Sequence, residues 1–196
     1  MHDLRRKALL LSYLTVGYNL LEGIVSVLAG AAAGSVALVG FGLDSAVESL
    51  SGCVMIWRLR RAAAGGGEEE ERVERKALRL IGATFFILAA YVLYESGASL
   101  LSGEAAGRTV LGVIIAAVSL VTMPALFWAK RRLGVKMGMG SLVADSKETL
   151  ACAFLSAALL AGLGLNYLWG LWWADPAAGL VIAAFLVREG AEAVSG

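Results

Sequence analysis

Long apolar stretches recur along this chain, and most are long enough to cross a membrane as a helix. A hydrocarbon core of about 30 Å requires about 20 apolar residues at a rise of about 1.5 Å per residue. Apolar windows of roughly this kind lie at residues 8–29, 36–57, 77–98, 109–129, 141–163 and 174–187. The last window is short, and we expect its helix to begin earlier, within the aromatic segment 167–173. The chain is therefore predicted to be an all-α membrane protein with six transmembrane helices.

The composition agrees with a protein that spans a lipid bilayer. Charged residues make up 17% of the chain and the mean hydropathy is +0.75, whereas soluble domains carry about 25% charged residues. The formal net charge of +1 argues against nucleic acid as a partner. The two cysteines, Cys53 and Cys152, both fall inside predicted spans, so no disulfide framework is expected. The first apolar stretch is interpreted as a retained span and not as a cleaved signal peptide.

Basic residues are distributed unevenly between the two sides of the predicted membrane. Nearly all of the 17 lysines and arginines fall on the side that carries both termini; Arg108 lies on the other side and Lys147 within the fifth span. The positive-inside rule then predicts that both termini are cytoplasmic. The expected location is the cytoplasmic (inner) membrane of a prokaryote.

One cytoplasmic segment, at about residues 58–76, differs in composition from the rest of the chain. Its glycines and its charged run predict a solvated linker, with a weak metal-gathering role for Glu68 to Glu71 as the alternative. Only eight residues follow Arg188. We therefore expect a single six-helix transmembrane domain over residues 1–196 and no soluble C-terminal domain.

Ionisable side chains lie at bilayer depth in the second and fifth predicted spans. Such groups are costly in lipid and mark functional sites by default. Asp44 and Glu48 form an i, i+4 pair on one helix face, and Glu148 and Cys152 have the same spacing. At about 1.5 Å per residue from the cytoplasmic end, Glu48 is level with Glu148, and Asp44 with Cys152. Two antiparallel helices would therefore place these four side chains around one divalent cation.

Other polar residues in the spans allow more than one interpretation. Glu22 lies at the depth of the same site, and Asn19 lies three residues before it, so both either line the cavity or bond to a neighbouring helix. Asp145 is expected to be a structural or gate acid near the cytoplasm, and Lys147 to snorkel or pair with an acid. Asp175 is expected to cap the start of its helix.

The donor types restrict which cation the site would take. Oxygen ligands alone suit Mg²⁺ or Mn²⁺, whereas a sulfur ligand shifts the preference towards Zn²⁺, Cd²⁺, Co²⁺ or Fe²⁺. Zn²⁺ is favoured, as a transported ion and not as a cofactor. Carboxylates and a thiol must lose their protons to bind metal. Metal/proton antiport is therefore the predicted mechanism, and no enzyme activity is expected.

Two segments resemble the cation diffusion facilitator family. SVALVGFGLDSAVESLSG resembles the family's second span with its DxxxD-type pair, and LVADSKETLAC resembles its fifth span with an ADxxHxxxD-like pattern. The resemblance implies six spans, efflux of divalent metal in exchange for protons, and a homodimer. The implied ligands are Asp44, Glu48, Glu148 and Cys152, where Glu148 replaces the usual His and Cys152 the usual Asp.

Two alternatives stay open at this point. A proton-coupled small-molecule exporter would have an aromatic-lined pocket and one dominant carboxylate. A non-transporting membrane scaffold would keep the same metal tolerance after Asp44→Ala. An intramembrane hydrolase is disfavoured, because the sequence has no GxGD or HExxH motif.

Overall fold

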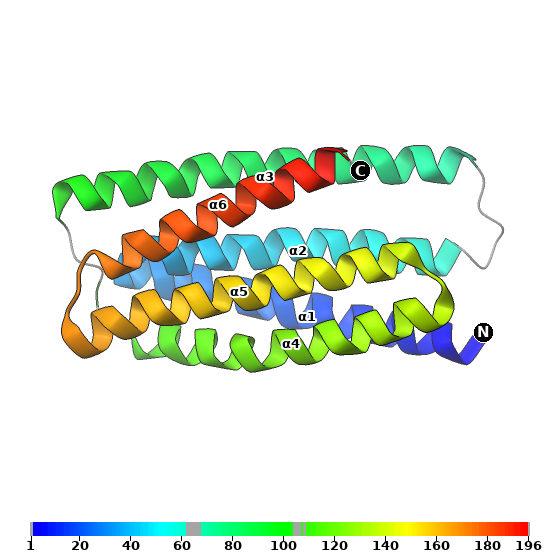
Figure 1. Cartoon of the computed structure of the whole chain (residues 1–196), viewed down its shortest axis with the longest axis horizontal. Helices are drawn as coiled ribbons and strands as arrows, with labels where there is room; N and C mark the ends of the chain where they lie inside the picture. Colours follow the sequence, from blue (N-terminus) through cyan, green and yellow to red (C-terminus); the bar gives the residue numbers. More distant parts are fainter. Residues whose placement is uncertain (1, 62–67, 104–106, 108, 196) are drawn as a thin grey trace.

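The computed structural model is a bundle of six α-helices in which consecutive helices run antiparallel (Figure 1). It describes residues 2–61, 68–103, 107 and 109–195, and these contain no β-strand. The start of α1, the end of α2, the start of α3 and the α4–α5 connection lie at one end of the bundle (Figure 1). The all-α fold is confirmed. The helices are α1 (His2–Ala33), α2 (Val36–Arg61), α3 (Glu68–Ser102), α4 (Val110–Met137), α5 (Gly140–Trp169) and α6 (Ala174–Ser195).

Five of the six helices, α1 to α5, contain stretches long and apolar enough to cross a membrane. Helix α6 differs because charged residues lie near both of its ends. Large apolar side chains, including those of Leu21, Ile87 and Val121, are exposed on the outside of the bundle. Since lipid accepts such a surface and water does not, the chain is a multi-pass membrane protein.

The sixth helix does not begin in the aromatic segment 167–173, so that prediction is wrong. Helix α5 continues through Trp169 and ends at Gly170, which adopts the left-handed conformation (φ +67°). The Gly170 N–H donates to the Asn166 carbonyl over 2.9 Å, which satisfies one of the last carbonyls of α5. A short turn then leads to α6 at Ala174.

The described part of the predicted linker at about 58–76 is helical. Helix α2 continues to Arg61 and α3 begins at Glu68, while residues 62–67 lie outside the described part of the chain. The side chains of Glu68 to Glu71 also lie outside it, so their metal-gathering role stays a prediction.

Helix α2 is central to the bundle, because it contacts α1, α3, α5 and α6. It approaches α1 closely at Gly42, where an added Cβ would lie 2.8 Å from the Cβ of Ser26 and 2.9 Å from the carbonyl oxygen of Gly23. Small residues permit this kind of close helix contact in membranes. The remaining faces of α2 are left for α3, α5 and α6.

The start of α2 is fixed by a residue of α6. Asp175 accepts a hydrogen bond from the Ser35 hydroxyl, and its Oδ2 lies 3.5 Å from the Ala37 backbone nitrogen. The Ser35 hydroxyl in turn accepts from the Leu38 N–H over 3.1 Å. Asp175 therefore caps α2 and not its own helix as expected, since its carboxylate meets the unpaired N–H groups at the start of α2.

Candidate functional site

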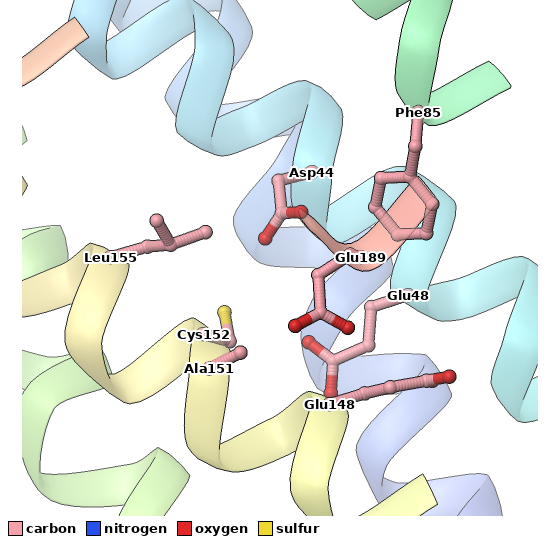
Figure 2. A pocket seen from close by; sticks show the side chains of 8 residues that line it. All are labelled: Asp44, Glu48, Phe85, Glu148, Ala151, Cys152, Leu155 and Glu189. Carbon is pink, nitrogen blue, oxygen red and sulfur yellow. The ribbon is translucent and has the colours of Figure 1, made fainter. Parts of the chain in front are cut away.

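One pocket brings together the polar residues of the second and fifth helices. Figure 2 shows Asp44 and Glu48 from α2, Cys152 from α5 and Glu189 from α6 around the same space. The pocket is lined by Asp44, Glu48, Phe85, Glu148, Ala151, Cys152, Leu155 and Glu189.

Most of these polar groups are withdrawn from the surface of the bundle. Asp44 is 5% exposed, Glu48 6% and Cys152 2%, while Glu148 and Glu189 are half-buried. A carboxylate at this depth is unfavourable unless it meets a cation, water or a hydrogen-bond donor. Oε2 of Glu48 has no hydrogen-bond partner among the described residues. That atom is therefore available to a cation.

Direct contacts join α2 to α5 at the pocket. The Ser51 hydroxyl donates to Oε2 of Glu148 over 2.6 Å, and the Thr149 hydroxyl lies 2.9 Å from Oε1 of Glu48. The Cys152 side chain lines the same pocket as Glu48. The expected meeting of the second and fifth helices is confirmed.

The complete ligand set stays a prediction. Within the part of the chain that the structure describes, no three His, Cys, Asp or Glu side chains lie close enough together to hold one metal ion. The four predicted ligands thus share a pocket but are not gathered into a coordination sphere.

Glu22 and Asn19 are not among the residues that line this pocket, although they are close to it in predicted depth, and their role as ligands stays a prediction. Oε1 of Glu22 accepts from the Tyr18 hydroxyl over 3.0 Å and from the Ser119 hydroxyl, and Oε2 accepts from Ser45 over 2.9 Å. Asn19 is fully buried, and its amide has no hydrogen-bond partner among the described residues. The structure therefore places Glu22 in a hydroxyl cluster between α1, α2 and α4.

The sequence interpretation missed the role of two residues near the site. Glu189 lies just beyond the last apolar window, 174–187, and Lys130 just beyond the fourth, 109–129. Helix α4 in fact continues to Met137, and Lys130 is buried with its Nζ 2.9 Å from Oδ2 of Asp145. This ion pair supports the interpretation of Asp145 as a structural acid. Lys147 is exposed.

Comparisons with known proteins agree with the resemblance in the sequence. A family model described as the cation efflux transmembrane domain matches residues 12–195. Over 147 residues, 73% of this chain, the sequence is 27% identical to an uncharacterized transporter from Synechocystis sp.. Over 155 residues, 77% of this chain, it is 22% identical to the magnetosome protein MamB from Magnetospira sp..

The matches to these two relatives cover 47% and 52% of their lengths, so the chain spans about half the length of the curated relatives it matches. The family match, in contrast, extends over nearly all of the chain and includes the helices that line the pocket. The chain belongs to the cation efflux, or cation diffusion facilitator, family.

Proposed function

We propose that this chain exports divalent metal cations, with Asp44, Glu48, Glu148 and Cys152 as ligands of the transported ion. The observation that supports this most is Oε2 of Glu48, which is buried and has no hydrogen-bond partner among the described residues. It belongs to a pocket that also receives acids from α5 and α6. A divalent cation would neutralise these acids together.

Loading of the ion would draw the side chains of α2 and α5 inward, because they are not yet within coordination distance of one centre. Carboxylate side chains can close such a gap by rotating about their χ angles.

Zn²⁺ is the proposed preferred substrate, because three carboxylates and one thiolate combine hard oxygen ligands with one soft sulfur. Cd²⁺, Co²⁺, Fe²⁺ and Mn²⁺ are competitors to be compared with it. Since the same ligands bind either protons or metal, the proposed cycle exchanges metal for protons.

The proposed orientation places the end of the bundle that carries the N-terminus in the cytoplasm. Basic residues gather there, near the start of α1 and the ends of α2 and α4, as the positive-inside rule requires. The membrane would then be a prokaryotic inner membrane with both termini inside. Assembly as a homodimer is inferred from family membership alone.

Transport by the purified chain in liposomes tests the proposal. Liposomes with a trapped fluorescent zinc indicator and an acidic interior should accumulate Zn²⁺, and Glu48→Gln should abolish the uptake. Glu192→Gln is the matched control, since Glu192 is exposed on α6 and bonds to Arg188 over 2.9 Å. Zn²⁺ uptake that is the same with and without the pH gradient contradicts antiport. Zn²⁺ uptake that is unchanged in Glu48→Gln contradicts the proposed binding site.

A further inference from the structure

Lys130 is a buried cation beside the acid-lined pocket. Its side chain, on α4, is 1% exposed, and its Nζ lies 2.9 Å from Oδ2 of Asp145, which is 4% exposed. Asp145 belongs to α5, which lies alongside α4 in the bundle (Figure 1). Because an ammonium group inside a membrane protein is costly unless it is paired, each of these two charges accounts for the presence of the other.

The ammonium group also reaches the pocket through Thr149. Nζ of Lys130 lies 2.8 Å from Oγ1 of Thr149, and the same Oγ1 lies 2.9 Å from Oε1 of Glu48. A lysine ammonium has hydrogens to donate and no acceptor. Thr149 therefore accepts from Lys130, and its own hydrogen is left for Glu48, since the contact with the Asp145 carbonyl is longer at 3.3 Å.

We call the hydrogen-bonded series from Lys130 through Thr149 to Glu48 the relay. The relay engages one oxygen of Glu48 and leaves the other one without a hydrogen bond. Oε2 has no hydrogen-bond partner among the described residues, and Glu48 lines the pocket together with Asp44 and Cys152. A carboxylate that is held through one oxygen presents the other in a defined direction. Groups that bond to metal ligands in this way orient them and tune their affinity.

A role limited to joining α4 to α5 would need only the ion pair between Lys130 and Asp145. The additional bond from Thr149 to Glu48 extends that pair across to α2. An unpaired positive charge at this place would repel an incoming cation. Asp145 neutralises it, so the relay can orient Glu48 without that repulsion.

We propose that Lys130 and Thr149 are positioning residues of the cation site, which hold Oε1 of Glu48 so that Oε2 faces the transported cation. This inference rests on the proposed function. The relay should therefore affect the apparent affinity for the cation, measured as KM, more than it affects the turnover rate.

Thr149→Val tests the relay with almost no change in side-chain volume. In zinc-uptake assays on liposomes, this variant should raise the KM for Zn²⁺ about tenfold or more and largely retain the maximal rate. Thr149→Ser, which keeps the hydroxyl, should restore most of the affinity. Thr15→Val is the matched control, since Thr15 is a buried threonine whose hydroxyl donates to the Leu11 carbonyl of its own helix.

A second variant keeps the test decisive if Thr149→Val does not fold. Lys130→Met combined with Asp145→Asn removes the ammonium without leaving an uncompensated charge, and it should raise the KM by the same order. Lys136→Met is its control, because Lys136 is exposed on the same helix. A wild-type KM in either folded relay variant, or a loss of maximal rate alone, overturns the inference.

The outcomes separate this inference from the function on which it rests. Uptake that is lost in Glu48→Gln but unaltered in Thr149→Val overturns the relay alone. A wild-type chain that takes up no more Zn²⁺ than Glu48→Gln overturns the proposed function, and the relay with it.

Discussion

Ser51 on α2 donates a hydrogen bond of 2.6 Å to Oε2 of Glu148 on α5. This bond joins the two helices that supply the predicted ligands, and it orients a carboxyl group that is half-buried. Hydrogen bonds to charged groups contribute about 1.5–3 kcal/mol net. The position of Glu148 therefore depends on α2 as well as on its own helix.

Ser51→Ala should weaken cation binding without abolishing it, because Glu148 loses an orienting donor but keeps its charge. A loss of about 1 kcal/mol corresponds to a KM for Zn²⁺ about fivefold higher. Ser49→Ala is the control, since the Ser49 hydroxyl donates to the Ser45 carbonyl of its own helix over 2.9 Å. Equal KM values for the two variants would show that the bond to Glu148 does not serve the site.

Glu189 should contribute to cation binding from α6, because it lines the pocket together with the acids of α2 and α5. Glu189→Gln removes one negative charge at nearly constant volume and should raise the KM for Zn²⁺ about threefold to tenfold through weaker Coulomb attraction. Initial uptake rates at varied Zn²⁺ measure this, with Glu192→Gln as the reference on the same helix. A KM equal to that of the reference would exclude Glu189 from the binding site.

Glu22→Gln should weaken cation binding much less than Glu48→Gln does, because Glu22 bonds to hydroxyl groups of Tyr18, Ser45 and Ser119 and does not line the pocket. Because Glu22 would then act on the cation through its charge alone, we expect the KM for Zn²⁺ to rise by no more than about threefold. The comparison with Glu48→Gln in the same assay is decisive. A comparable loss of Zn²⁺ affinity in both variants would indicate that Glu22 is also a ligand of the cation.

Gly42→Ala should destabilise the bundle, because an added Cβ would lie under 3 Å from Ser26 and from the Gly23 carbonyl. Overpacking of this kind costs about 1–3 kcal/mol, measurable by denaturant unfolding in detergent. Gly97→Ala is the control, since nothing lies within 4 Å of an added Cβ there. A Gly42→Ala variant as stable as Gly97→Ala would contradict the close contact of α1 with α2.

The sequence predicted those features that the bilayer itself imposes. The width of the hydrocarbon core sets the length of each apolar stretch, so the helices could be located before their ends were known. The i, i+4 spacing of Asp44 with Glu48, and of Glu148 with Cys152, fixed which side chains share a helix face. Because consecutive spans run in opposite directions, the depths of these side chains in the membrane could also be compared, and they matched.

Features that depend on how helices rotate and pack were not predictable in the same way. The depth of Glu22 suggested the site, but in the fold its carboxylate bonds to hydroxyl groups of α1, α2 and α4 and does not line the pocket. Lys130 ends an apolar window when hydropathy alone is considered, and only the fold reveals that Asp145 compensates its charge. Glu189 was missed because the sixth helix continues beyond its apolar window.

Calorimetric titration of the purified chain with Zn²⁺ tests most directly whether α2 and α5 share one cation. The wild-type chain should bind one Zn²⁺ per pocket, and Asp44→Asn on α2 and Glu148→Gln on α5 should each weaken that same binding event by at least tenfold. Glu192→Gln should bind as the wild type does. Wild-type affinity in either Asp44→Asn or Glu148→Gln would contradict a cation site shared between the two helices.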